Sequence, residues 1–164
     1  MQAELKDREQ VCKAKAKVVR LVHLYQFKFG EYFAKYMDVF FQKIWEIIAE
    51  NRIVAGRESE RLVFAIIKYV GEASGLPNYT EFLKQNLSTI FKVLVLPNIA
   101  ITQEDIDEFE DEPETYIKND LEESDQETRR RYCMKFVQTL SKRYPQEFGQ
   151  LVGELIGLLN SEYE

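Results

Sequence analysis

The feature that most constrains the fold is a series of apolar residues that recur every three or four positions. Residues 31–51 show it best, with a stripe made of Phe33, Met37, Phe41, Ile44 and Ile48. This spacing predicts an amphipathic α-helix with one buried face. It recurs at residues 3–29, 58–74, 79–96, 126–144 and 145–163. Seven glycines and four prolines in 164 residues are too few for a loop-rich all-β protein, so the sequence predicts an all-α fold.

Short breaks separate the predicted helices. Gly30 is expected to end the first helix as a C′ residue, and residues 51–56 break the second. Asn78 is a suitable N-cap for the fourth helix, and Pro97 is expected to end that helix. Pro145 is expected to open the last helix.

The helices are expected to form pairs, each close to the roughly 40–47 residues of a HEAT-type repeat. We therefore predict a single α-solenoid fragment over residues 1–164, with about three HEAT-type helical hairpins. A globular helical bundle is the alternative. The predicted parts are a first helical pair at 1–51, a second at 57–96, an acidic insertion at 102–125 and a third pair at 126–163.

Three apolar sets are expected to belong to the core. The set in the first helix consists of Cys12, Val19, Val22 and Phe29, with Ala14 and Val18 nearby. The set in the last helix consists of Phe148, Val152, Leu155, Ile156 and Leu159. The second helix carries an aromatic cluster that we expect to be core rather than a ligand pocket: Phe33, Tyr36, Phe40, Phe41 and Trp45.

Residues 102–131 differ from the rest of the chain in their charge. From Glu104 to Glu127 there are thirteen Asp or Glu and one basic residue, Lys118, which gives a local charge of −12. Since the whole chain carries −6, the remaining residues sum to +6. The acidity is therefore confined to one insertion.

The insertion is expected to contain two short helices. Thr102 can cap the first, at residues 103–109, and Pro113 suits the first turn of the second, at residues 114–121. Ser124 and Glu127 form a capping box that opens the next helix. A thin apolar side indicates docking onto another element: Phe109, Tyr116, Ile117 and Leu121.

Three roles remain open for the insertion: an internal hinge, an acidic surface that binds a partner, or a solvated segment with no role of its own. The candidate hinge or partner-contact residues are Asp107, Glu110, Asp111, Tyr116, Asp120, Glu122, Glu123, Arg129, Arg130 and Arg131. We expect the three arginines to pair with Asp120, Glu122 and Glu123, and so to fasten the insertion to the solenoid.

The sequence contains no catalytic constellation, so we expect a non-enzyme without a cofactor or metal. His23 is the only histidine and is expected to be structural. Cys12 and Cys133 form no C-x-x-C pair and are expected to be reduced core thiols of an intracellular protein. A calcium loop built on the insertion would lack the required glycine, since none lies between Gly75 and Gly149.

The charge and hydropathy of the chain exclude two further classes of partner. The charged N-terminus predicts no signal peptide, and no apolar run approaches the roughly 20 residues that span a bilayer. A chain with a pI of about 5.1 and an arginine run beside thirteen acids is not expected to bind nucleic acid. A soluble cytoplasmic or nuclear protein is expected.

A longer pattern joins the insertion to both flanks. In order it consists of Leu96-Pro97-Asn98, Glu108-Phe109-Glu110-Asp111, Glu114-x-Tyr116-Ile117, Asp120-Leu121-Glu122, Ser124-Asp125 and Thr128-Arg129-Arg130-Arg131. This run resembles the importin-α re-exporters, the cellular apoptosis susceptibility-type exportins of the importin-β superfamily. Lys118-Asn119 stands where that family tends to have two arginines, and Glu123 stands where a glycine is usual.

The resemblance implies a long superhelix of HEAT repeats that wraps importin-α and Ran-GTP together. Such a receptor carries importin-α out of the nucleus, shuttles through the nuclear pore, and releases its cargo after GTP hydrolysis in the cytoplasm. The chain would be an internal stretch of it, and many contacts with Ran and importin-α would lie outside this stretch. A generic HEAT or armadillo interaction scaffold unrelated to Ran is the alternative.

Overall fold

The computed structural model describes residues 2–49, 59–120 and 129–162, and every regular element within these ranges is helical. The long helices are α1 (Gln2–Lys28), α2 (Gly30–Ala49), α3 (Glu60–Ala73), α9 (Arg129–Arg143) and α10 (Pro145–Glu162). The short ones are α4 (Pro77–Gln85), α5 (Leu87–Ile90), the π-helix η1 (Phe91–Val95), α6 (Leu96–Ile99), α7 (Gln103–Asp111) and α8 (Pro113–Asp120). The predicted all-α class is confirmed.

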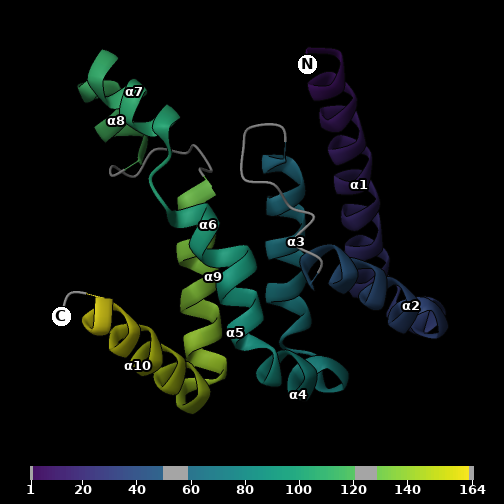
Figure 1. The fold of residues 1–164 in the computed structure, drawn as a ribbon. Helices are drawn as coiled ribbons and strands as arrows, with labels where there is room; N and C mark the ends of the chain where they lie inside the picture. The colour runs from purple at the N-terminus through teal and green to yellow at the C-terminus, as the bar shows by residue number, and fades with distance from the viewer. Residues whose placement is uncertain (1, 50–58, 121–128, 163–164) are drawn as a thin grey trace.

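The helices form two layers (Figure 1). Helices α1, α3 and α9 lie side by side in one layer, with α3 in contact with both neighbours. In the other layer α2 contacts η1, and α5 contacts α10. The acidic α7 and α8 follow α6 and precede α9 in the chain, and they project beyond these layers, while α6 and α9 contact each other. Stacked layers of this kind make an α-solenoid, as predicted; the division into helical pairs stays a prediction.

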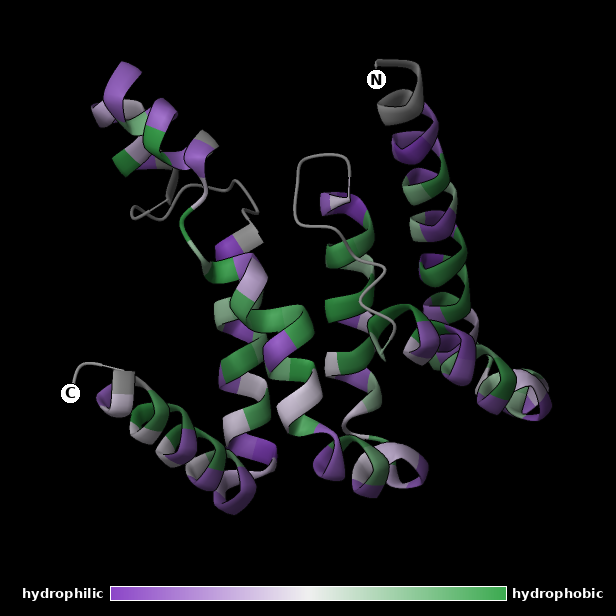
Figure 2. Ribbon diagram, viewed as in Figure 1, coloured by the Kyte–Doolittle hydropathy of each residue, from purple (hydrophilic) through white to green (hydrophobic). Residues whose placement is uncertain are grey.

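The core is centred on α3, because this helix has neighbours on several sides. Its eight buried residues are Leu62, Val63, Ala65, Ile66, Ile67, Tyr69, Val70 and Ala73. The Tyr69 hydroxyl donates a hydrogen bond of 2.8 Å to Oε1 of Gln26, which is itself buried in α1. Burial raises the pKa of Tyr69 well above that of an ordinary tyrosine. Figure 2 shows hydrophobic residues along α3 and mainly hydrophilic ones on α7 and α8.

The aromatic cluster of α2 is only partly core. Phe41 is buried and stacks on Tyr79 with ring centroids 4.1 Å apart. Trp45 lies edge-on to Phe82 beside an open hollow of about 470 Å³. Tyr36 is 48% exposed, so its assignment to the core is wrong.

The fourth predicted helix does not run straight to Pro97. Asn86 interrupts it, and η1 then widens it by one residue per turn, so that the N–H of Leu96 donates to the carbonyl of Phe91. Pro97 lies inside α6 instead of ending the helix. A proline removes one helical hydrogen bond and crowds the carbonyl four residues before it, and a π-turn relieves that crowding. Buried Asn98 donates to the carbonyl of Leu94 at 2.7 Å, which helps the helix continue past the proline.

Two predicted helix ends are also wrong. Gly30 is the first residue of α2, and Phe29 alone separates it from α1. The N-cap of α4 is Leu76, not Asn78, because Pro77 occupies the first turn, where its missing N–H costs nothing. The predicted break at residues 51–56 and the capping box of Ser124 lie outside the described residues.

The two outer helices expose several residues predicted to be core. Val19 and Val22 of α1 are buried, but Val18 and Phe29 are about half exposed. Ile156 of α10 is 53% exposed. Helices α1 and α10 lie at the two ends of the stack, so among the described helices each has neighbours on one side only. The side chain of Leu159 is not among those described.

Candidate functional site

The insertion begins with a capped helix. Thr102 Oγ1 accepts the backbone N–H of Asp105 at 3.3 Å, and Asp105 Oδ2 accepts the backbone N–H of Thr102 at 2.6 Å. This reciprocal capping box satisfies two N–H groups that a helix start leaves unpaired. The cap predicted at Thr102 is confirmed, and it holds the carboxylate of Asp105 in a fixed position.

Arg130, near the start of α9, contacts both helices of the insertion. Its Nη2 lies 2.7 Å from Asp105 Oδ2, and its Nη1 donates a hydrogen bond of 2.7 Å to the Tyr116 hydroxyl. Tyr116 in turn packs edge-on against Phe109, with ring centroids 5.6 Å apart. Since the side chains of Arg130 and Asp105 are only 15% and 19% exposed, water screens this ion pair less than a surface pair. One arginine thus joins α7, α8 and α9.

The predicted site residues have different surroundings. Tyr116 and Arg130 come together, whereas Asp107, Glu110 and Asp111 are exposed on α7. Asp107 accepts a hydrogen bond from Gln103, one turn earlier in the same helix. Arg131 is half-buried. The side chains of Asp120, Glu122, Glu123 and Arg129 are not among those described, so pairing of the arginines with these three acids stays a prediction.

Asp105 is not predicted from the sequence as the partner of an arginine. The available signal is the Thr102-x-x-Asp105 spacing, which places a carboxylate at the helix start. Whether Arg130 lies close to Asp105 depends on the path of the chain from α8 to α9, and no local sequence pattern predicts that path.

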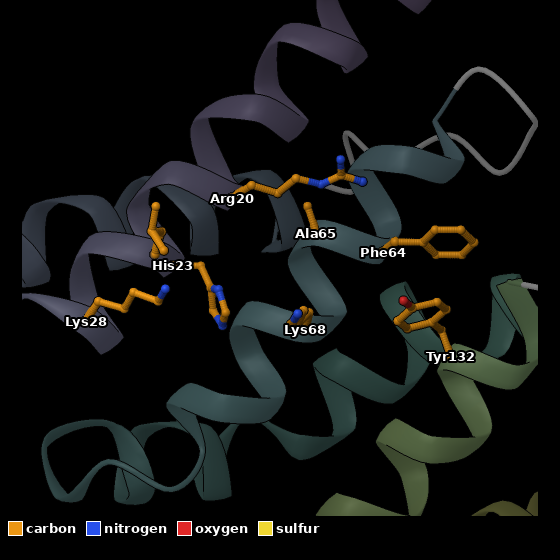
Figure 3. A pocket seen from close by; sticks show the side chains of 8 residues that line it. Arg20, His23, Lys28, Phe64, Ala65, Lys68 and Tyr132 are labelled. Carbon is orange, nitrogen blue, oxygen red and sulfur yellow. The ribbon is translucent and has the colours of Figure 1, made fainter. Parts of the chain in front are cut away.

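A second candidate site is a cavity on the layer formed by α1, α3 and α9 (Figure 3). This cavity of about 570 Å³ is lined by Arg20, His23, Leu24, Lys28, Phe64, Ala65, Lys68 and Tyr132. Phe64 and Tyr132 stack across the gap between α3 and α9, with centroids 4.6 Å apart. His23 Nε2 lies 2.8 Å from Glu72 Oε2, which ties α1 to α3 and agrees with the structural role predicted for it.

A neighbouring cavity of about 450 Å³ continues along α3. It shares Lys68 and Tyr132 with the first cavity, and Lys135 and Arg143 of α9 also line it. We call the two cavities together the α3 groove. Its lining holds five Lys or Arg side chains and one carboxylate, that of Glu72.

Candidate groups for metal or thiol chemistry do not gather in the described part of the chain. Among residues 2–49, 59–120 and 129–162, no three His, Cys, Asp or Glu side chains are placed to hold a metal ion. None of the described helices is long and apolar enough to cross a membrane. Cys133 is buried and Cys12 half-buried, and the two are not joined in a disulfide.

Comparison with known proteins identifies the family. A family model described as Cse1 matches residues 1–164. The importin alpha re-exporter of Saccharomyces cerevisiae is 30% identical over 133 residues, which cover 80% of this chain and 14% of that protein. Exportin-2 of Mus musculus is 34% identical over 142 residues, which cover 84% of this chain and 14% of that protein. This chain therefore spans about one-seventh of these relatives.

A solved structure supports the same assignment. The exportin Cse1 in its cargo-free, cytoplasmic state superposes with a TM-score of 0.76 at 26% identity, covering 92% of this chain and 16% of that one. The match includes the HEAT-type architecture predicted from the sequence. The family match over all residues, the fold, and the identities with re-exporters lead to one conclusion: the chain belongs to the Cse1 family.

Proposed function

We propose that this chain is part of a nuclear export receptor that carries importin-α from the nucleus to the cytoplasm in a Ran-GTP-dependent complex. The observation that carries the proposal is the Cse1 family match over all 164 residues. The names of two relatives, importin alpha re-exporter and exportin-2, support it. The receptor shuttles through the nuclear pore and acts by surface contact and bending rather than by catalysis.

For the insertion we propose the role of a hinge. It leaves the stack after α6, and Arg130 at the start of α9 contacts Asp105 of α7 and Tyr116 of α8. A shift of those contacts would change how the repeats on either side meet. The exposed acids Asp107, Glu110 and Asp111 would remain available for a partner in any bent state.

The export proposal is tested by a pull-down of importin-α with the full-length protein. Ran is added in its GTP-bound or GDP-bound form, and a sample without Ran serves as the baseline. We expect retention of importin-α only with Ran-GTP. Equal retention in all three samples, or none in any, would favour the generic HEAT scaffold instead.

The hinge proposal needs a separate measurement. Small-angle scattering of the full-length protein is compared with that of a variant lacking residues 104–123. We expect the deletion to change the balance between extended and closed forms. Superimposable curves from the two proteins would refute a hinge and leave the export proposal untouched.

A further inference from the structure

We propose that the α3 groove binds an acidic segment of a partner protein. The groove lies on the face formed by α1, α3 and α9, so a segment lying in it would cross three consecutive helices of one layer. This inference needs neither Ran nor importin-α, and it stands apart from the export function proposed above.

The first support is the charge of the lining. Five cations from three helices converge on the groove: Arg20, Lys28, Lys68, Lys135 and Arg143. Within the described parts of the chain none of the five forms an ion pair, and the single carboxylate, Glu72, lies against His23. The five residues are exposed to solvent. Like charges that line one hollow raise its positive potential, and this potential attracts an anionic ligand.

The second support is the shape and chemistry of the groove floor. The two cavities are neighbours, because Lys68 and Tyr132 line both of them, and together they follow α3 from the side of α1 to the side of α9. Leu24 and the stacked rings of Phe64 and Tyr132 add apolar surface among the cations. An extended peptide can place carboxylates on the cations and an apolar side chain against these rings. Surface charge steers such an encounter, and the apolar contact limits dissociation.

The charge around the groove favours a short acidic peptide over nucleic acid. The chain carries −6, and −12 is concentrated in residues 104–127, which meet α9 at Arg130. Tyr132 and Lys135 of the groove follow Arg130 within two turns of α9. A long polyanion that leaves the groove on this side would meet the acidic insertion, whereas a peptide with a few carboxylates can be confined to the groove.

The test uses the full-length protein and a fluorescein-labelled peptide of glutamates interspersed with tyrosines. Binding is followed by fluorescence anisotropy at low and at raised salt. The groove variant combines Arg20→Glu, Lys68→Glu and Lys135→Glu. The matched control combines Lys35→Glu, Lys43→Glu and Lys92→Glu, which changes the net charge equally outside the groove. We expect the groove variant to lose about tenfold or more in affinity and the control less than about twofold.

Three further arms make the outcome decisive. The same peptide with glutamine for glutamate should not bind, and circular dichroism checks that each variant is folded. Should the charge-reversed variant not fold, Arg20→Gln with Lys68→Gln and Lys135→Gln takes its place with the same expected direction. The proposal is overturned by equal losses in groove and control variants, by no binding of the acidic peptide, or by tighter binding of single-stranded oligothymidine at the same cations.

Discussion

Helix α3 and the pair α7–α8 belong to the same chain but are held in place by different forces. Eight of the fourteen residues of α3 are buried against neighbouring helices. Among the described residues of α7 and α8 none is fully buried, and Asp105 and Tyr116 are half-buried where Arg130 meets them. Among the described residues the stack therefore depends on apolar burial, whereas polar contacts of Arg130 and the Thr102 cap help to hold the insertion. The insertion should be able to detach while the stack stays folded.

Truncation of the α3 core tests the first half of this contrast and should have the largest effect. Ile66 is fully buried, so Ile66→Ala removes apolar contacts and leaves a cavity, which costs about 2–5 kcal/mol. The measurement is urea unfolding followed by circular dichroism. Ile106→Ala in α7, where the side chain is 41% exposed, is the matched control and should cost less than about 1 kcal/mol. Equal losses would show that the two regions share one core.

Removal of Arg130 tests the second half of the contrast, the polar attachment of α7 and α8. Arg130→Ala removes the guanidinium that lies 2.7 Å from Asp105 Oδ2 and donates to the Tyr116 hydroxyl, at a cost of about 1–3 kcal/mol to the attachment of α7 and α8. Hydrogen exchange should speed up about tenfold or more in residues 103–120, with much smaller changes in α3. Arg130→Lys should give an intermediate rate, because lysine keeps the charge but not the two-pronged geometry.

The control for this exchange experiment is Lys118→Ala, which removes an exposed cation from the insertion itself. It should leave exchange in α7 and α8 nearly unchanged. If Arg130→Ala also left it unchanged, the attachment would have to come from other contacts, and the hinge proposal would lose its structural basis.

The same contrast explains how much the sequence predicts. Helical periodicity places α1, α2, α3 and α10 within a few residues, and the Thr102 cap and Pro113 place both insertion helices. These features are local, because each depends on side chains within one or two turns. The resemblance carried by residues 96–131 predicts the family.

What the sequence does not predict depends on partners distant along the chain. The exposure of Val18 and Ile156 follows from which helix lies alongside α1 and α10. The pairing of Arg130 with Asp105 spans 25 positions, and the α3 groove is assembled from three helices. Periodicity identifies a buried face but not the helix that covers it, so such sites appear only in the folded chain.

A polar contact inside the core should be worth less than the apolar packing around it. Tyr69→Phe removes the hydroxyl that donates to Gln26 and leaves that buried amide without this partner, at a cost of about 1 kcal/mol. Tyr25→Phe makes the same chemical change at a residue that is 48% exposed and should be nearly neutral. Thermal unfolding of both variants measures the difference. A loss at Tyr69 as large as that of Ile66→Ala would mean that hydrogen bonding, not packing, dominates this part of the core.

The smallest expected effect belongs to a partly exposed ion pair between α4 and α10. Lys84 of α4 donates to Glu147 of α10 at 2.8 Å, and this hydrogen bond lowers the pKa of Glu147 and raises that of Lys84. A lowered carboxylate pKa adds stability above the pKa of the unfolded chain, about 4.3, and that stability is lost as the pH falls through the lower folded value.

The raised pKa of Lys84 adds stability at pH values below the lysine pKa of the unfolded chain, about 10.4. This contribution to stability is lost as the pH rises through the lysine pKa of the folded protein. The Tm difference between wild type and Glu147→Gln should thus be small and constant from about pH 6 to pH 9, and should shrink towards pH 3. Added salt should reduce it at every pH, because both side chains are partly exposed. A difference that grew on acidification would place the stabilising charge elsewhere. Such a result would also mean that the exposed Lys84–Glu147 pair does not hold α10 to the stack, in contrast to the less exposed Arg130–Asp105 pair at the insertion.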